Sequence, residues 1–506
     1  MSLDTALLIA RSGLLHTQRA LANAADNTAN VDTEGYTRKR IATEAVAIDG
    51  KGTGIRSLGL SRDVDNALVN EMNKRRSEAA AAELRDSTLS LINEAHGDPA
   101  KGEGLGDLVA KLRNSFIELR FDPSLVVKQQ AVVLNAGQNM ISRFNDLSRV
   151  VLEARQAAHD GAIEEIKTIN QSLSELAGLV RGIMERSSAG QSTADMEDKR
   201  DLALARLSEA IGFKPIRQSD GGLLLLGAGG AIIPLSENGD AFTLESTALL
   251  PESYYGSGGA IPPITMNGVD VTRQILGGRL GEYLVLRDQT LPRYQAELDI
   301  GAVEIAHRFK QEGLKLFTDA TGGVPDPDLP YAGSTQIGFA AGIQINAAVR
   351  SEVRLLRDGT ETIPGPGGFT PNPPGGPAGF TDLIDRILDH SFGERTSAGI
   401  SWGGFTMTGL GPDGSLSSPF GAPRTIEDYA ALITSSHTAD SAAAGRVFAT
   451  AKQFSEGLEA RFTRQSRVDI DSEMASLIQL QNAYAANARV ISTAQTMWDT
   501  LVGAVR

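Results

Sequence analysis

Heptad patterns at the two ends of the chain constrain its fold most. Near the N-terminus, apolar or small residues recur every seven positions in two registers. The first register holds Leu3, Ala10, Thr17, Ala24 and Val31, and the second holds Leu7, Leu14, Leu21 and Thr28. A sustained seven-residue repeat predicts a helix that packs along a partner helix.

The C-terminal pattern is clearer still and predicts a helix over about residues 471–505. One register holds Ile470, Leu477, Tyr484, Ile491, Trp498 and Val505, and the other holds Met474, Gln481, Ala488, Gln495 and Val502. Asp471 and Glu473 lie at the predicted start, where the helix dipole favours negative charge.

The partner of each end helix stays open at this point. Tertiary packing, rather than intrinsic propensity, supplies most of the stability of a helix. We therefore expect each end helix to be ordered only when packed, either on the other end or on neighbouring subunits. An ordinary intramolecular bundle is the alternative, because heptad seams are common.

The middle of the chain alternates helical and β-leaning segments. Asp122-Pro123 is a natural helix start, and two seven-spaced apolar sets follow it. These sets are Ile166, Leu173 and Val180, and Ile169, Leu176 and Ile183. Residues 212–282 combine glycine with short apolar runs, which is typical of a β domain. The prolines between 364 and 377 indicate a loop or linker.

We predict a mainly α fold with inserted β domains, a bundle of long helices and an outer β-rich region. In this arrangement the terminal helices would pair with each other as a coiled coil, which is one of the two possibilities left open above. The predicted units are a terminal coiled-coil domain of residues 1–35 with 468–506, a helical bundle of 36–211 with 284–317 and 425–467, an inserted β domain of 212–283, and a Gly/Pro-rich outer segment of 318–424 with some β structure.

Charge is distributed unevenly over the 506 residues. The formal net charge is −14. Residues 1–40 hold five Lys/Arg and four Asp/Glu, and residues 464–506 hold four of each sign, so both ends are nearly neutral. An acidic body argues against nucleic acid or an anionic membrane as the main partner. No apolar run approaches the length of a membrane span.

Motifs for catalysis, cofactors or metals are not recognisable. The chain has no cysteine, which excludes disulfides, thiolate catalysis and Cys-ligated zinc. Its six histidines lack the spacing of a helical metal pair. We expect no metal, no cofactor and no enzymatic activity. A wall hydrolase would need a pair of catalytic carboxylates in residues 212–440, and none is convincing.

The residues at both ends resemble a known family. Asn27-Thr28-Ala29-Asn30-Val31-Asp32-Thr33-Glu34-Gly35-Tyr36 is similar to the N-terminal signature of bacterial flagellar rod, hook and hook-associated proteins. Thr37-Arg38, together with the C-terminal stretch around Asn487-Ala488-Arg489, is more typical of the hook-associated protein 1 branch. The family usually has asparagine where this chain has Asp26 and Asp32.

The resemblance implies a non-enzymatic structural subunit at the junction between flagellar hook and filament. It implies assembly into a ring of copies, contacts with hook protein and with the second junction protein, and a cytoplasmic chaperone on the C-terminal helix. It also implies export by the flagellar type III apparatus without a cleaved signal, and an extracellular place in the flagellum. The alternatives are another axial subunit, such as a hook or rod protein, and a flagellum-associated wall hydrolase.

The heptad patterns and the resemblance single out two sets of residues. The expected assembly interface consists of Leu3, Leu7, Leu14, Leu21, Val31, Ile470, Met474, Leu477, Tyr484, Ile491, Trp498 and Val505. The family motif positions are Asn27, Asn30, Thr33, Gly35, Tyr36, Asn487 and Arg489. We expect the 30–36 turn to be structural, with Gly35 adopting a backbone angle that other residues resist.

Overall fold

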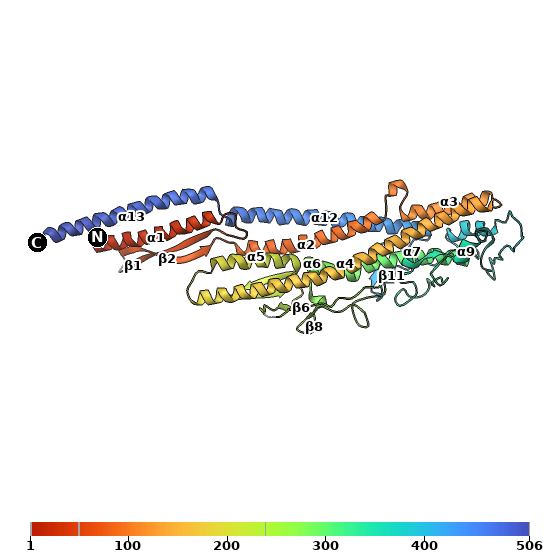
Figure 1. Cartoon of the computed structure of the whole chain (residues 1–506), viewed down its shortest axis with the longest axis horizontal. Coiled ribbons are helices and arrows are strands. Elements are labelled where there is room, and N and C mark those ends of the chain that lie inside the picture. Colours follow the sequence, from red (N-terminus) through yellow and green to blue (C-terminus); the bar gives the residue numbers. More distant parts are fainter. Residues whose placement is uncertain (1–2, 49–50, 238, 505–506) are drawn as a thin grey trace.

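The computed structural model describes residues 3–48, 51–237 and 239–504. Figure 1 shows an elongated molecule in which the first and last helices lie side by side at one end, close to both termini. Helices make up 59% of the chain and the sheets are small. The predicted fold class, mainly α with inserted β regions, is confirmed.

A helical pair and one hairpin form the end that carries both termini. Helix α1 (Leu3–Ala29) packs against α13 (Ile470–Ala504) and against the hairpin of β1 (Lys39–Ile48) and β2 (Lys51–Arg62). We call the described residues of 3–62 and 470–504 the terminal unit. The domain boundary predicted at residue 35 differs from the structure, because residues 39–62 form a hairpin that lies on α1 rather than in the helical bundle.

Long helices form the body of the molecule. They are α2 (Asn66–Ala95), α3 (Leu105–Phe121), α4 (Val126–Ser188), α5 (Ala194–Ala210), α6 (Gly278–Val285), α7 (Leu291–Gln311) and α12 (Ile426–Ser466), with short η1 (Pro99–Lys101) and η3 (Leu286–Thr290) between them. Side-chain caps define two of the starts. The Asp65 carboxylate accepts hydrogen bonds from the N–H groups of Ala67 and Leu68 ahead of α2, and the Thr425 hydroxyl accepts one from Asp428 N–H ahead of α12.

The start predicted for the longest helix at Asp122-Pro123 is wrong. Asp122 follows the end of α3, and α4 begins four residues later at Val126. Asp122 therefore lies at the C-terminal side of one helix and Pro123 in the turn before the next. The two apolar sets predicted along α4 are confirmed, since Ile166, Leu173 and Ile183 are buried with the rest.

Helix α4 is shared by two hydrophobic cores. Its first half packs with α3, α7 and α12 around residues such as Phe144 and Phe309. Its second half packs with α5, α6 and the inserted β region around Ile169 and Leu204. That region contains two three-stranded antiparallel sheets. Their strands are β3 (Phe213–Arg217), β4 (Leu223–Gly227), β5 (Ile232–Ile233), β6 (Phe242–Thr243), β7 (Thr265–Met266) and β8 (Val269–Asp270), followed by η2 (Thr272–Gln274).

Residues 318–424 cover the end of the molecule opposite the terminal unit (Figure 1). Their elements are short: β9 (Phe317–Thr318), α8 (Phe339–Gly342), β10 (Gln344–Ile345), α9 (Ala347–Ser351), α10 (Leu355–Asp358), α11 (Asp382–Arg386), η4 (Ile387–Ser391), β11 (Thr408–Leu410) and β12 (Leu416–Ser417). The proline stretch is a packed loop and not a linker. Phe369 belongs to the same core as α3 and α7, and the buried Asn372 amide donates to the Asp358 carboxylate at 2.8 Å.

Candidate assembly surface and its junction

Small residues let α1 approach α13 closely. Ala10, Thr17 and Ala24, which form the first predicted register, are buried. A Cβ atom at Gly13 would lie 3.0 Å from the side-chain amide of Asn487, so the Asn487 side chain fills the space that a side chain at position 13 would need. On α13, only Glu473 and Ala494 are buried among the described residues. The pairing is therefore tight but covers little apolar surface.

The most buried positions of α13 are offset by one residue from one of the two predicted registers, that of Met474. Glu473, Asn487 and Ala494 are seven or fourteen residues apart and lie one position before the register of Met474. Side chains of small or polar type make the close approach possible. Met474 and Trp498 of the predicted seam are exposed, whereas Leu477 and Ile491 are half-buried.

The predicted interface residues divide into two groups by exposure. Half-buried are Leu3, Leu7, Leu14, Leu21, Val31, Leu477 and Ile491. Exposed are Ile470, Met474, Tyr484 and Trp498. Val505 lies outside the described residues. The folded chain on its own thus leaves part of the predicted seam in contact with water.

Exposed apolar side chains are concentrated on the terminal unit. Of the 28 large apolar side chains exposed in the described part of the chain, 14 lie there. They are Leu8, Ile9, Leu15, Leu58, Leu60, Ile470, Met474, Ile478, Tyr484, Val490, Met497, Trp498, Leu501 and Val502. Since the unit is about a fifth of the chain, this density marks a surface suited to contacts with other molecules.

The family motif closes the first helix in a compact turn. Asn30, Thr33 and Tyr36 each donate a backbone N–H to a carbonyl three or four residues earlier. Gly35 has a φ of 77°, and a Cβ there would lie 3.3 Å from Leu202 of α5. Positive φ and close packing both favour glycine at this position.

Tyr36 anchors the turn to the helix that precedes it. Its hydroxyl lies 3.0 Å from the Asp26 carboxylate and 3.0 Å from the Asn27 side-chain oxygen. Burial, and then the hydrogen bond to Asp26, raise the pKa of Tyr36 well above its usual value. The phenol therefore stays protonated and keeps its role as a donor.

The Asn27 side chain makes the two backbone hydrogen bonds at the start of β1 that a neighbouring strand would otherwise make. Its side-chain amide donates to the Lys39 carbonyl at 3.0 Å, and its side-chain oxygen accepts from the Lys39 N–H at 3.1 Å. Asn27 is buried, so both groups would be costly to leave unpaired. The two motif positions on α13 lie in different surroundings. Asn487 faces Gly13 of α1, whereas Arg489 is exposed.

Arg38 ties together the two places where the chain passes between terminal unit and body. Its N–H donates to the carbonyl of Ser466 at the end of α12, and its carbonyl accepts from Asp63 N–H before α2. Its guanidinium lies 2.6 Å from the carboxylate of Glu473 in the first turn of α13.

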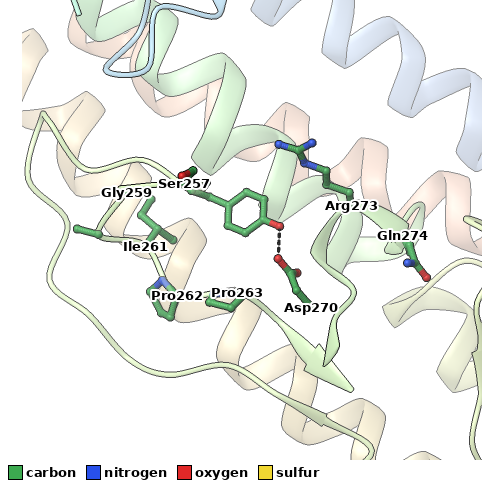
Figure 2. Close-up of a pocket in the computed structure, with 11 residues that line it drawn as sticks. Ser257, Gly259, Ile261, Pro262, Pro263, Asp270, Arg273 and Gln274 are labelled. Carbon is green, nitrogen blue, oxygen red and sulfur yellow. Dashed lines mark hydrogen bonds between the residues drawn. The ribbon is translucent and has the colours of Figure 1, made fainter. Parts of the chain in front are cut away.

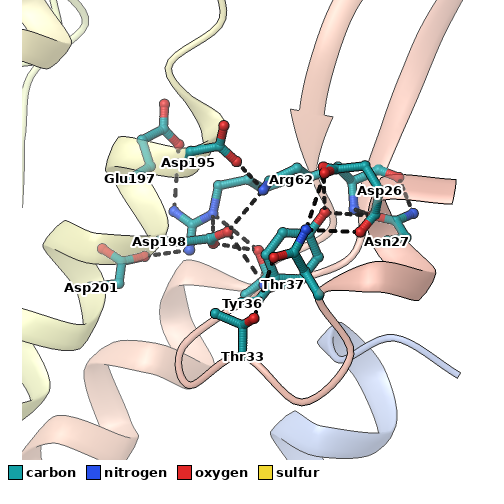
Figure 3. Close-up of polar contacts among 12 residues, drawn as sticks. Asp26, Asn27, Thr33, Tyr36, Thr37, Arg62, Asp195, Glu197, Asp198 and Asp201 are labelled. Atoms are coloured by element: carbon teal, nitrogen blue, oxygen red, sulfur yellow. Dashed lines mark hydrogen bonds and ion pairs between the residues drawn. The ribbon is translucent and has the colours of Figure 1, made fainter. Parts of the chain in front are cut away.

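An ionic cluster joins the hairpin to α5 (Figure 3). Lys39 and Arg62 are paired opposite each other at the open end of the hairpin. The Lys39 ammonium contacts Asp195 and lies 3.5 Å from Asp198. Arg62 lies 2.8 Å from Asp198 and 2.7 Å from Asp201. We call these five residues the ionic joint.

Burial and pairing act in opposite directions on the groups of the joint. Burial lowers the pKa of Arg62, but Asp201 and Asp198 raise it above its ordinary value. Burial raises the pKa of Asp201, but Arg62, Arg200 and Arg217 bring it below its ordinary value. Burial dominates at Asp198, whose pKa stays raised. The charges of Arg62 and Asp201 therefore depend on oppositely charged neighbours.

Sequence reasoning missed the ionic joint. The spacing of Asp195, Asp198 and Asp201 places them on one face of α5, which is the available signal. Their partners lie more than 130 residues earlier, and no local pattern specifies that pairing.

No group of three or more possible metal ligands gathers in the part of the chain that the structure describes. The pocket shown in Figure 2 is lined by residues such as Pro262, Asp270 and Arg273 and has a volume of about 560 Å³. The Asp270 carboxylate already accepts hydrogen bonds from the Tyr255 hydroxyl and from Thr272.

Among the described helices, none is long and apolar enough to cross a membrane.

Three family models match the chain. Their descriptions are flagella basal body rod protein, over residues 7–37, flagellar hook-associated protein FlgK helical domain, over 89–323, and flagellar basal body rod FlgEFG protein C-terminal, over 460–504. Flagellar hook-associated protein 1 of Bacillus subtilis is 23% identical, covering 99% of this chain and 97% of that protein. The protein of the same name from Salmonella typhimurium is 23% identical over 62% of this chain and 57% of its own length.

One solved structure is also similar. The flagellar hook junction protein FlgK from Burkholderia pseudomallei aligns over 51% of this chain and 45% of its own, with 22% identity. The TM-score of 0.39 is too low to compare the two folds. The resemblance predicted from the two ends of the sequence is confirmed by the family models and by the relatives.

Proposed function

We propose that this chain, a homologue of flagellar hook-associated protein 1, is a structural subunit that forms the junction between hook and filament of the bacterial flagellum. It assembles through its terminal unit and has no enzymatic role. The relatives support this function because the similarity to the Bacillus subtilis protein extends over nearly the whole of both chains.

The concentration of exposed apolar side chains on the terminal unit carries the proposal. Helix α13 exposes Met474, Met497 and Leu501 on a chain whose body is acidic. Covering such side chains releases about 25 cal/mol for each Å² of apolar surface removed from water. Neighbouring copies that present the same surface supply that cover, whereas the charged bodies repel one another and stay apart.

The partners follow from the proposed place in the flagellum. The subunit forms a ring with copies of itself, and it contacts hook protein on one side and the second junction protein on the other. Before export by the flagellar type III apparatus, a cytoplasmic chaperone covers the exposed face of α13. The terminal unit forms the inner layer, and the body and residues 318–424 lie progressively further out.

Deletion of residues 472–506 tests the proposal in motile cells. We expect loss of filaments, with filament protein released into the medium, because the next subunits have nothing to assemble on. The matched control replaces Leu250 and Ile400, exposed apolar residues of the body, by serine and should leave filaments intact. Normal filaments on cells that carry the deletion would contradict the proposal.

A further inference from the structure

The terminal unit shares no hydrophobic core with the body among the residues that the structure describes. Both hydrophobic clusters, with the partly buried residues that pack on them, lie between residues 84 and 444. The chain passes between the two parts only through the short segments 63–65 and 467–469. The direction of the terminal unit must therefore be set mainly by polar contacts.

The ionic joint holds the strongest of these contacts. The Lys39 side chain is 2% exposed and that of Arg62 is 6% exposed, so both cations are removed from water. Pairs of this kind tolerate little displacement, because a buried charge that loses its partner is strongly destabilising. The joint also connects the two strands of one hairpin to one helix face, which restrains rotation as well as translation.

A cavity with a mixed polar and apolar lining adjoins the joint and gives it room to rearrange. It has a volume of about 110 Å³ and is lined by Thr37, Arg62, Asn73 and Asp198, among others. Asn73 is buried, and its side-chain nitrogen and oxygen have no protein partner. The polar part of the lining, around Asn73 and Asp198, can hold water molecules, and these can replace protein partners if the angle changes.

We propose that Lys39 and Arg62 are positioning residues, which fix the angle at which α1 and α13 leave the body. This inference rests on the proposed function, since the angle matters only if neighbouring terminal units must meet. Loss of the ionic joint leaves a folded body and a folded helical pair that no longer share one orientation. In such a subunit the assembly surface of the terminal unit is intact, but its orientation relative to the body no longer matches that of neighbouring subunits.

Distance measurements on the full chain test the inference directly. Because the chain has no cysteine, spin labels on Arg19→Cys in α1 and Lys74→Cys in α2 report the angle without interference, and both sites are exposed. We expect one narrow distance distribution in the parent protein. In Arg62→Gln we expect additional distances that the parent lacks, and in Arg62→Lys, which keeps the charge, fewer of them.

Two further variants separate positioning from folding. Arg56→Gln removes an exposed ion pair with Glu44 on the same hairpin and should leave the distribution unchanged. Asp195→Asn removes a partner of Lys39 whose side chain is 73% exposed, so it changes charge without changing packing. It should add distances even if Arg62→Gln does not fold. An unchanged distribution in Asp195→Asn and in every folded Arg62 variant would overturn the inference.

Filament assembly distinguishes this inference from the proposed function. Cells with Arg62→Gln should assemble fewer filaments than cells with Arg56→Gln. If the distances spread in Arg62→Gln but filaments form normally, the claim that assembly needs a fixed angle is wrong while the proposed function stands. If filaments also form without residues 472–506, the proposed function itself fails.

Discussion

His96, His437 and Glu297 form a buried chain of hydrogen bonds between three helices of the body. His437 Nε2 lies 2.8 Å from the Glu297 carboxylate, and its Nδ1 lies 2.9 Å from His96 Nε2. Since the carboxylate can only accept, His437 Nε2–H donates to it, and between His437 Nδ1 and His96 Nε2 one ring nitrogen donates to the other. The acid and the distal histidine lie on opposite sides of the His437 ring, so the three cannot bind one metal.

The pH dependence of stability should reflect this chain of hydrogen bonds. Burial, followed by the charges of His437 and Arg143, lowers the pKa of His96 to about 3, whereas an unfolded histidine titrates near 6.5. Between these values the unfolded state binds more protons, so the free energy of unfolding falls as pH decreases from 6.5 toward 3. The full shift corresponds to roughly 5 kcal/mol.

Replacing His96 by glutamine should reduce this dependence on pH. A glutamine amide can still donate to His437, so we expect a loss of only about 1–2 kcal/mol at pH 7. Urea unfolding between pH 4 and pH 7 measures the slope, with the partly exposed His390→Gln as control. Parallel curves for His96→Gln and the parent would show that His96 does not carry the effect.

At the scale of single residues, the sequence predicted the family motif, but it did not predict which distant residues contact each other in the fold. The sequence predicted a structural turn at 30–36, and Gly35 has the positive φ expected of it. No spacing in the sequence pairs any of the six histidines, yet His96 and His437 are buried in contact with each other. They are 341 residues apart in the sequence, and only the packing of α2 against α12 brings them together.

At the scale of elements, the packing of α1 on α13 depends on glycine and on residues with small side chains. A heptad pattern identifies both helices, but it does not specify which face of α13 meets α1. Gly13 and Ala494 decide that face, because close approach is possible only where neither helix carries a large side chain. The large apolar residues that dominate the sequence pattern are left for other contacts.

Substitution of Gly13 tests this packing. Gly13→Val places a branched side chain against Asn487, so we expect α13 to separate from α1 and to become sensitive to protease at concentrations below those needed for the parent. Intrinsic helix propensity alone predicts the opposite, since valine is a better helix former than glycine. Gly457→Ala in α12 has open space around it and should be neutral or slightly stabilising. Equal protease resistance of α13 in Gly13→Val and the parent would contradict the close approach.

At the scale of the whole molecule, composition and shape agree. The nearly neutral ends lie together at one end of the elongated molecule, and the acidic body extends away from them (Figure 1). The sequence predicted the pairing of the ends and the inserted β regions. It indicated a separate outer segment at residues 318–424, whereas their apolar residues share a core with α3 and α7, which only the three-dimensional packing specifies.

Labelling of a single cysteine tests most directly whether the terminal unit is the assembly surface. Leu501 is 61% exposed in the isolated chain, and Ile400, which lies in segment 318–424 outside the terminal unit, is 67% exposed. In the purified monomer, Leu501→Cys and Ile400→Cys should both react rapidly with a maleimide. In intact flagella, we expect Leu501→Cys to be protected and Ile400→Cys to remain reactive. Equal reactivity of Leu501→Cys in the monomer and in the flagellum would contradict assembly through the terminal unit.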